Sequence, residues 1–429
     1  MALGQPQAKP ERLRTSLISQ VGSQVFRLAV SIGIGGWTAR YLGPEQLGTL
    51  SYVAALVGVL SPLGSLGVKG SLAILLCEEP PRPGLVATAF WIELVGTAVI
   101  ALVLVPFAWA ARDPVLAGLM GLAVLGNLFS SAEVFEVELL NRQQGTRVAK
   151  ARLAETVAGA GASIVALLSR APLVAFGGVQ TVAMVAQAVV LTGFANGYRL
   201  STTLREVSWP TAHVLLKRGW PLLLAGLSVM LYVKSDQVML EWLRGPEDVG
   251  QYSVAVKAAE SLYFLPVILT ATFLPRIGRG SGDFHTSSAL RRLYRSAWTL
   301  GVGMALTTSE VLSPLIPVVF GSEFHAAQDA MIWLGLASFA VSTGTASSSW
   351  LQRAGLEKVS AARTAAGCVA NILLNLTLIP RYGFHGAAIA TCISYGLATF
   401  AVMAVWSEET RANVLKLAFP FQLGGQDDR

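Results

Sequence analysis

The chain has 429 residues, of which 53% are hydrophobic and only 13% are charged, with a formal net charge of +7. Because a soluble globular protein carries about a quarter charged residues, this composition excludes a protein with an ordinary water-facing surface. The three cysteines form no CxxC pair and the four scattered histidines show no metal-ligand spacing, which excludes a disulfide scaffold and a zinc site. We expect an all-α membrane protein without a metal or cofactor.

Twelve apolar segments are long enough to cross a bilayer, which takes about 20 mostly apolar residues in a helix. They are predicted at residues 17–40, 46–68, 85–111, 115–139, 151–169, 173–197, 214–240, 248–274, 296–320, 327–350, 360–379 and 385–406. The first segment is too long for the apolar region of a cleavable signal peptide, so we expect it to remain as an anchor. The loops between the spans are too short to hold a soluble domain.

Lysine and arginine residues alternate strongly between the two faces that these spans define. The face that carries both termini holds 24 of them, whereas the opposite loops hold five, namely Arg40, Arg112, Arg170, Arg244 and Arg381. Cytoplasmic loops of membrane proteins carry the excess of Lys and Arg, so we place both termini in the cytoplasm. The net positive charge is thereby explained by topology, and we expect no nucleic-acid partner.

A short motif after the first span recurs after the seventh span, at a constant offset of 202 residues. The matching residues are Gly43, Pro44, Glu45, Gly48 and Ser51 in the first copy and Gly245, Pro246, Glu247, Gly250 and Ser253 in the second. Each copy is a tight turn that begins a helix, with proline near the first helical position and an acidic residue at the positive helix end. Gly-Pro-Glu is also a generic way to begin a helix, but the equivalent positions favour a duplication.

The duplication divides the chain into two halves, which usually form a transporter with its site at the membrane midplane between them. We expect a cytoplasmic N-terminal segment (1–16), a six-helix bundle (17–197), a cytoplasmic linker (198–213), a second six-helix bundle (214–406) and a cytoplasmic tail (407–429).

Several segments resemble one family of membrane proteins when they are taken in order. They are Arg40–Tyr52 (RYLGPEQLGTLSY), Leu63–Gly67 (LGSLG), Tyr232–Met239 (YVKSDQVM), Gly250–Lys257 (GQYSVAVK), Phe320–Phe324 (FGSEF), Asn371–Asn375 (NILLN) and Ile379–Thr391 (IPRYGFHGAAIAT). In this order and spacing, the chain resembles the Wzx-type polysaccharide-repeat-unit flippases of the multidrug/oligosaccharidyl-lipid/polysaccharide exporter superfamily.

The resemblance implies two six-helix bundles around a central cavity that opens alternately to each side of the bacterial inner membrane. It implies a cargo of undecaprenyl-diphosphate-linked oligosaccharide repeat units, made on the cytoplasmic face and delivered to the outer leaflet. The partners that it implies are this lipid-linked glycan, membrane lipid and polysaccharide polymerase or export machinery.

Charged side chains inside spans are the main candidates for the site, because each is costly in the bilayer unless it faces water or a partner. Arg27 lies near the middle of the first span, and Gln20, Gln24 and Ser31 share its helix face. We expect Arg27 and Gln24 to line the cavity. The alternative is that Arg27 pairs with a carboxylate such as Glu93 or Glu133 and joins two helices.

The second half supplies two further cations. Lys234 and Asp236 are two residues apart, so they cannot share a helix face, whereas Lys257 and Glu260 can. Lys257 therefore either contacts cargo or pairs with Glu260. If Arg27, Lys234 and Lys257 converge, they form a cationic pocket that suits a diphosphate or an acidic sugar and repels cationic drugs.

The remaining candidates are polar. Asn371 and Asn375 form one face of the eleventh span, and they either bind sugar hydroxyls or join helices. A Ser/Thr face on the tenth span has the same two interpretations, and helix packing is the preferred one. The candidates for ion coupling are Asp236, Glu260 and Glu310, the last of which is equally expected to join helices.

Two other functions were weighed against the flippase. An ion-coupled small-molecule or multidrug antiporter of the same superfamily is the alternative, and a cavity lined by unpaired carboxylates would favour it. A polymerase, ligase or glycosyltransferase is disfavoured, because the outer loops are a few residues long and no DxD-like metal motif occurs outside the tail. We therefore expect no enzymatic activity.

Overall fold

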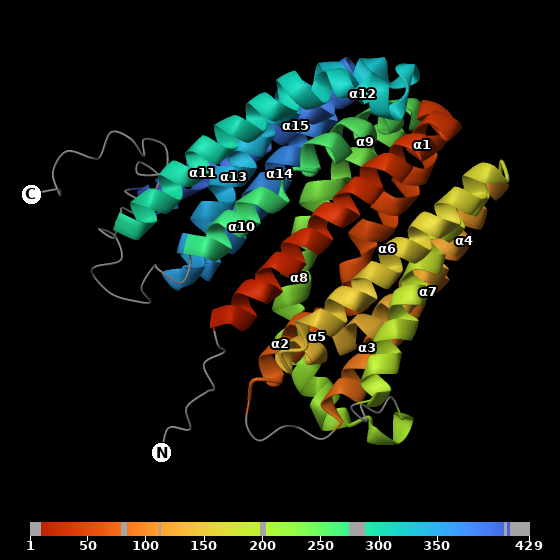
Figure 1. Ribbon diagram of the computed structural model, residues 1–429, viewed down its shortest axis with the longest axis vertical. Coiled ribbons are helices and arrows are strands. Elements are labelled where there is room, and N and C mark those ends of the chain that lie inside the picture. The colour runs from red at the N-terminus through yellow and green to blue at the C-terminus, as the bar shows by residue number, and fades with distance from the viewer. Residues whose placement is uncertain are drawn as a thin grey trace, which may run out of the picture. The chain divides into compact units, whose positions relative to one another are not determined.

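The computed structural model describes residues 10–78, 84–110, 113–197, 203–273, 288–406 and 410–411. Every regular element within these ranges is a helix, mostly α-helical with short 3₁₀ and π segments (Figure 1). The parts of the predicted N-terminal segment, linker and tail that fall outside these ranges lie outside the described residues. The all-α membrane fold is confirmed.

Eleven helical stretches of the described residues are long and apolar enough to cross a membrane. One of them, Phe26–Ser65, has 40 residues, which as a straight helix would span about 60 Å, about twice the hydrocarbon thickness of a bilayer. Its backbone leaves the helical conformation at Gly43, where φ is 71° and ψ is 175°. The stretch is therefore two spans joined by a sharp turn, and all twelve predicted spans are accounted for.

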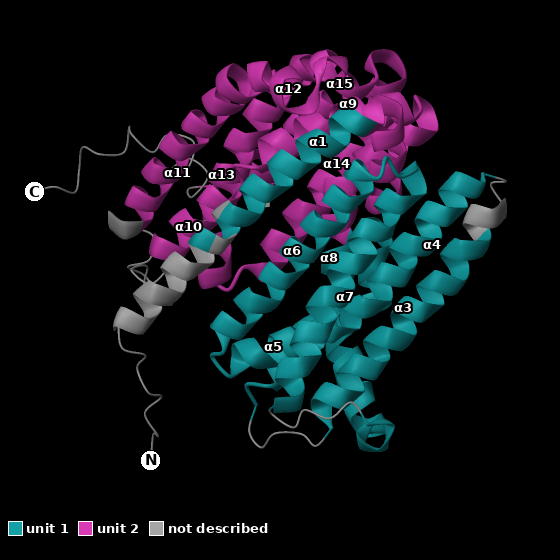
Figure 2. Cartoon of the chain, turned by 45° about the vertical axis from the view of Figure 1, so that its right-hand side comes forward, with its two compact units in different colours: residues 1–41, 56–227 teal, residues 42–55, 228–429 magenta. Residues whose placement is uncertain are grey.

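The chain divides into two compact units, coloured separately in Figure 2. Unit 1 comprises Met1–Tyr41 and Leu56–Leu227. Its helices are the N-terminal and C-terminal parts of α1 (Pro10–Ser65), then α2 (Val68–Leu75), α3 (Leu85–Ala110), α4 (Pro114–Leu128), η1 (Phe129–Ala132), α5 (Glu133–Asn141), α6 (Gly145–Leu168), α7 (Leu173–Gly197), η2 (Leu204–Glu206) and the first half of α8 (Trp209–Leu243).

Unit 2 comprises Leu42–Ala55 and Ser228–Arg429. Its helices are the middle of α1, the second half of α8, then α9 (Pro246–Glu260), α10 (Phe264–Phe273), α11 (Ser288–Leu306), η5 (Thr307–Leu312), α12 (Ser313–Phe320), η6 (Ser322–Ala330), α13 (Met331–Arg353), α14 (Glu357–Tyr382), α15 (Phe384–Gly396), η7 (Leu397–Ala401) and α16 (Val402–Trp406). The division into halves at 17–197 and 214–406 stays a prediction.

Each unit has its own apolar core. In unit 1, Leu72, Val134 and Leu215 are fully buried where α2, α5 and α8 meet. In unit 2, Tyr294 and Trp350 bury their rings between α11 and α13. Because helices in a bilayer associate mainly through close van der Waals packing, these contacts hold the helices of each unit together.

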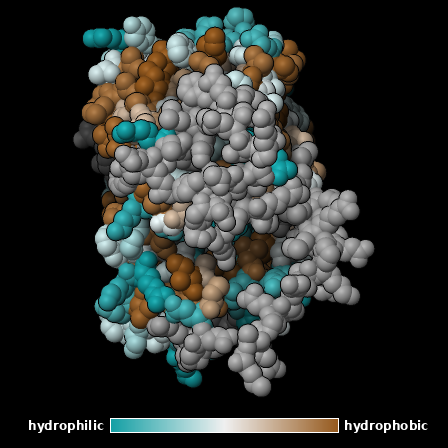
Figure 3. All heavy atoms as spheres, turned by 90° about the vertical axis from the view of Figure 1, so that its left-hand side faces the viewer, coloured by the Kyte–Doolittle hydropathy of each residue, from teal (hydrophilic) through white to brown (hydrophobic). Residues whose placement is uncertain are grey.

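Large apolar side chains also cover much of the outer surface. Leu102, Leu168, Val189 and Val405 are each at least 65% exposed. Figure 3 shows apolar side chains at the molecular surface, interspersed with hydrophilic ones. An exposed apolar surface of this extent marks a protein whose solvent is lipid rather than water.

The repeated motif has a structural reason within unit 2. Gly245 has φ 98° and ψ 178°, nearly the conformation of Gly43, and this region is essentially open to glycine alone. The two helices that begin there cross at Gly48 and Gly250. A Cβ on Gly48 would overlap the carbonyl oxygen of Pro246, and a Cβ on Gly250 would overlap the carbonyl oxygen of Pro44. The recurring glycines are therefore required twice, for the turn and for the crossing.

Candidate functional site

Arg27 belongs to a cluster of charged side chains in unit 1. Its side chain is half-buried, and one guanidinium nitrogen donates a hydrogen bond to Oε1 of Gln24, one turn earlier in α1. The charges that act on Arg27 are those of Arg152, Glu155 and Glu136. The Nε of Arg27 is buried and donates to no described group. The guanidinium therefore keeps hydrogen-bonding capacity to spare.

Arg152 brings a second guanidinium to this cluster from α6. It forms an ion pair with Glu136 of α5, and Glu155 lies one turn further along α6. Because the charges of Arg27 and Arg152 repel each other, the pair is best stabilised by a negative group. Arg152 lies near the start of the span predicted at 151–169, and the structure extends this helix to Gly145–Leu168.

The two carboxylates named as alternative partners of Arg27 pair with a different cation. Glu93 and Glu133 both bind Lys69 of α2, with Nζ–Oε distances of 2.8 Å and 2.5 Å. Lys69 was predicted to lie in a loop. Instead, the chain breaks at Leu66 and Gly67, which have positive φ values of 49° and 69°, and resumes as α2 with Lys69 in its first turn. The three side chains, Lys69, Glu93 and Glu133, are called the lysine triad below.

Asp236 is the most buried of the predicted site residues that carry a charge, with 4% of its surface exposed. The hydroxyl of Tyr252 donates to its Oδ2, the hydroxyl of Thr391 donates to the same oxygen at 3.4 Å, and the amide of Gln237 donates to Oδ1 at 2.8 Å. The carboxylate thus joins α8 to α9 and α15. The spacing predicts that Lys234 and Asp236 do not share a helix face, and Lys234 is half-buried whereas Asp236 is buried.

Lys234 and Glu260 lie near this carboxylate within unit 2, and Lys257 lies one turn before Glu260 on α9. The charge of Lys234 acts on both Asp236 and Glu260. Lys257 is half-buried on α9, and within the described ranges it makes no ion pair with Glu260 or any other carboxylate. The local pair that was the alternative to cargo contact is absent there. The convergence of Lys234 and Lys257 with Arg27 stays a prediction.

Asp236 and Glu260 line the same small cavity in unit 2. It has a volume of about 10 Å³ and is lined by Val233, Asp236, Tyr252, Val256, Ala259, Glu260, Tyr263, Leu334, Thr391 and Tyr395. A cavity of this size holds about one water molecule. Two carboxylates and three tyrosine side chains therefore surround a space fit for one water or one small ion.

Asn371 and Asn375 are fully buried in unit 2. Oδ1 of Asn371 accepts hydrogen bonds from Ser235 at 3.2 Å and from Asn375 at 2.9 Å, and its Nδ2 donates to Ser394 at 3.3 Å. The asparagines therefore bind α14 to α8 and α15. On the Ser/Thr face of the tenth span, Ser342 donates to the carbonyl oxygen of Ala297 in α11 at 2.8 Å, which is a contact between two helices.

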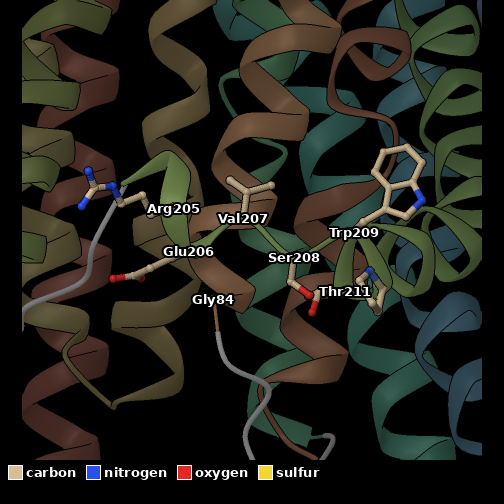
Figure 4. A pocket seen from close by; sticks show the side chains of 8 residues that line it. Gly84, Arg205, Glu206, Val207, Ser208, Trp209 and Thr211 are labelled. Atoms are coloured by element: carbon tan, nitrogen blue, oxygen red, sulfur yellow. The ribbon is translucent and has the colours of Figure 1, made fainter.

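Glu310 lies in the π-helical segment η5 and is exposed. It forms no ion pair with any residue that the structure describes. A larger pocket of about 660 Å³ lies in unit 1, where Gly84 meets the end of the predicted linker (Figure 4). None of the predicted site residues lines it, and its walls carry both Arg205 and Glu206.

The sequence of residues 38–329 matches the model of a family described as polysaccharide biosynthesis protein. This match covers more than half of the chain. The chain belongs to the polysaccharide biosynthesis protein family.

Individual relatives of this polysaccharide biosynthesis protein are distant in sequence. It is 21% identical over 371 residues to the probable low-salt glycan biosynthesis flippase Agl15 of Haloferax volcanii, which covers 84% of this chain and 76% of that protein. Its fold is similar to an inward-facing multidrug resistance MATE family transporter of the MOP superfamily, with a TM-score of 0.71 and 15% identity over 94% of this chain and 98% of the other.

The fold is also similar to the lipid II flippase MurJ in an inward closed conformation, with a TM-score of 0.68 and 13% identity over 95% of this chain and 91% of that one. These structural likenesses confirm the predicted fold, and the family match bears out the predicted resemblance to proteins of polysaccharide biosynthesis. The residues that sequence reasoning missed are Lys69 and Arg152, together with the roles of Glu136 and Glu155. The sequence feature that could have revealed them is a set of four glutamates in or beside predicted spans, namely Glu93, Glu133, Glu136 and Glu155. Carboxylates inside a membrane require cations at the same depth.

Proposed function

We propose that this protein is a flippase that moves undecaprenyl-diphosphate-linked oligosaccharide repeat units from the cytoplasmic to the outer leaflet of a bacterial inner membrane. Family membership supports a role in polysaccharide synthesis, and the names of Agl15 and MurJ support the flipping of a lipid-linked glycan. The repeat units then serve polysaccharide polymerase or export machinery on the outer face.

The observation that carries the proposal is the arginine pair of unit 1, Arg27 and Arg152. A diphosphate must lose much of its hydration to cross a bilayer, and isolated charges are very costly in an apolar medium. Guanidinium groups offset this cost through two parallel hydrogen bonds to phosphate oxygens, each worth about 1.5–3 kcal/mol. The Nε of Arg27, which donates to no described group, is available to donate a hydrogen bond to a phosphate oxygen.

The protein performs no covalent chemistry in this proposal. Arg27, Arg152, Lys234 and Lys257 hold the diphosphate in a central cavity, and the lipid tail stays in the bilayer. The cavity opens alternately to the two faces through movement of the two halves, as in other duplicated transporters. Gln24 orients Arg27 through the hydrogen bond described above.

Ion coupling in the second half is proposed for Asp236 and Glu260, because both carboxylates line one small enclosed cavity. Glu310 is the weaker candidate, since its side chain is exposed. The second candidate function is an ion-coupled small-molecule or multidrug antiporter. The similarity of the fold to MATE family transporters favours it.

Deletion of the gene separates the two functions. The flippase account expects lipid-linked repeat units to accumulate facing the cytoplasm while surface polysaccharide disappears. Re-expression of the wild-type gene restores the polysaccharide, and re-expression of an Arg27→Glu variant at the same protein level does not. Normal polysaccharide together with altered drug tolerance would reject the flippase and favour the antiporter.

A further inference from the structure

The lysine triad of unit 1 contains one negative charge more than it contains positive charges. Lys69 lies between Glu93 and Glu133, at 2.8 Å and 2.5 Å from their carboxylate oxygens. One ammonium neutralises only one of the two carboxylates. An unbalanced charge at this depth is costly in a membrane, so the second carboxylate requires a further positive species.

The groups around the triad do not remove this imbalance. The described charges that act on Glu93 are those of Lys69 and Glu133, and Glu133 in turn acts on Arg152 and Glu155. If the whole charged cluster is counted, its cations are Lys69, Arg27 and Arg152, and its carboxylates are Glu93, Glu133, Glu136 and Glu155. Three cations therefore face four carboxylates, and one carboxylate remains in excess.

Glu93 is the most deeply buried carboxylate of the triad. Its surface is 0% exposed. Its Oε1 contacts the ammonium of Lys69 at 2.8 Å, and its Oε2 accepts no hydrogen bond from any group that the structure describes. The other two side chains of the triad are about one-third exposed, so water or a proton can reach Glu93 through them. A buried carboxylate oxygen that lacks a donor is stabilised by a proton.

The backbone beside the triad is built from breaks that move more easily than a continuous helix. Lys69 follows the positive-φ pair Leu66 and Gly67, and Glu133 follows the 3₁₀ segment η1, in the middle of a span. Mid-helix 3₁₀ segments often mark functional hinges. Glu93 is carried by α3, which packs against α1 where Gly64 meets Gly96.

We propose that the lysine triad binds one exchangeable proton, shared between Glu93 and Glu133, and that this proton controls the affinity of unit 1 for an anionic ligand. The proton removes the excess negative charge from the cluster that contains Arg27 and Arg152. An anionic headgroup therefore binds more tightly to the protonated state. By linkage, binding of the anion raises the affinity of the triad for the proton by the same factor, on the order of tenfold.

Proton binding itself is tested without any substrate. The full-length protein in lipid nanodiscs is titrated with acid, and the infrared absorbance of protonated carboxyl groups is recorded for wild type and variants. We expect Glu93→Gln to remove the absorbance of one carboxyl group. We expect Lys69→Met to add one, because two carboxylates without their ammonium must both be protonated. The matched control is Glu138→Gln, since Glu138 lies on the same helix as Glu133 and pairs with Arg142 rather than with Lys69.

An unchanged titration in Glu93→Gln would overturn the proton site, provided that the variant elutes and unfolds as wild type does. A lower absorbance in Lys69→Met would overturn it independently. Displacement of the absorbance by sodium at constant pH would also overturn it, because the triad would then bind a metal cation instead.

The link to an anionic ligand rests on the proposed function, so it has a separate readout. Undecaprenyl diphosphate is the probe, and its binding to wild type is measured across the titration. We expect binding to strengthen on the order of tenfold as the triad becomes protonated, and Glu93→Gln to bind tightly at every pH. Binding of equal strength at every pH in wild type would overturn the link. Loss of all probe binding with an intact proton titration would instead reject the proposed function and leave the proton site standing.

Discussion

Replacing Gly48 by alanine tests the crossing of the two repeated turns in unit 2. The new Cβ would overlap the carbonyl oxygen of Pro246. Ordinary contacts between carbon and a carbonyl oxygen are about 3.3–3.6 Å, so the two helices would have to separate by about 1 Å or more. The obstructing atom belongs to the backbone, and therefore no side-chain rotation relieves the overlap.

The expected cost follows from this geometry. Overpacking a close contact typically costs about 1–3 kcal/mol, and we expect Gly48→Ala at the upper end because only helix movement relieves it. For a unit of this size, each kcal/mol lowers Tm by about 2–4 °C, so Tm should fall by roughly 6–12 °C. Gly250→Ala, which overlaps the carbonyl of Pro44, should behave alike, and the double variant should cost less than the sum because the helices are already apart.

The assay is thermal unfolding of the full-length protein in detergent, with Gly58→Ala as the matched control. Gly58 lies on the same helix, and nothing lies within 4 Å of the Cβ position. Its replacement should change stability by at most about 1 kcal/mol, in the stabilising direction. Equal Tm values for Gly48→Ala and Gly58→Ala would refute the crossing, and fully additive losses at Gly48 and Gly250 would show that the two sites do not share one contact.

Substitutions at three further positions test the site. Arg27→Glu should abolish surface polysaccharide at a normal protein level, whereas Arg27→Lys should keep roughly a tenth of wild-type export, because a lysine cannot form the bidentate fork; export by Arg27→Glu at wild-type level would remove Arg27 from the site. Lys257→Glu should likewise abolish export, while Lys257→Arg should preserve it, and immunoblots check the protein level. Asn371→Ala should lower the free energy of unfolding by about 2–3 kcal/mol, since it leaves Ser235 and Asn375 without a buried partner; an unchanged Tm would contradict the packing role.

The spans could be predicted from sequence because the bilayer imposes a length and a composition on each helix. Even the sharp turn at Gly43, which the structure embeds in a continuous helical stretch, followed from the Gly-Pro-Glu motif and its second copy. The physical reason for that motif could not be predicted. The contact between Gly48 and Pro246 joins residues about 200 positions apart, and only the packed helices reveal it.

The sequence indicates that charged residues inside spans need partners of opposite charge, but it does not show which residues pair. Pairing of Arg27 with Glu93 or Glu133 was the alternative to a cavity-lining role, and the structure pairs both carboxylates with Lys69. Lys69 reaches them because positive φ values at Leu66 and Gly67 redirect the chain, and no pattern of hydrophobicity encodes that direction.

The polar face of α14 shows the same limit. Helical periodicity places Asn371 and Asn375 on one face, but it does not say whether that face meets water or a neighbouring helix. The structure buries both against Ser235 and Ser394. Whether this face meets water or a helix depends on the orientation of α14 about its own axis relative to α8 and α15. That orientation is determined by packing across the whole unit.

The central claim, that the chain moves lipid-linked oligosaccharide across a bilayer, is tested most directly with the purified protein in liposomes. Lipid-linked repeat units are placed in both leaflets, and an added glycosidase cleaves only those that face outward. Wild-type protein should allow cleavage to proceed to completion, whereas Arg27→Glu and protein-free liposomes should stop when the outer leaflet is exhausted. Cleavage that stops at the same point with wild-type protein would contradict the account.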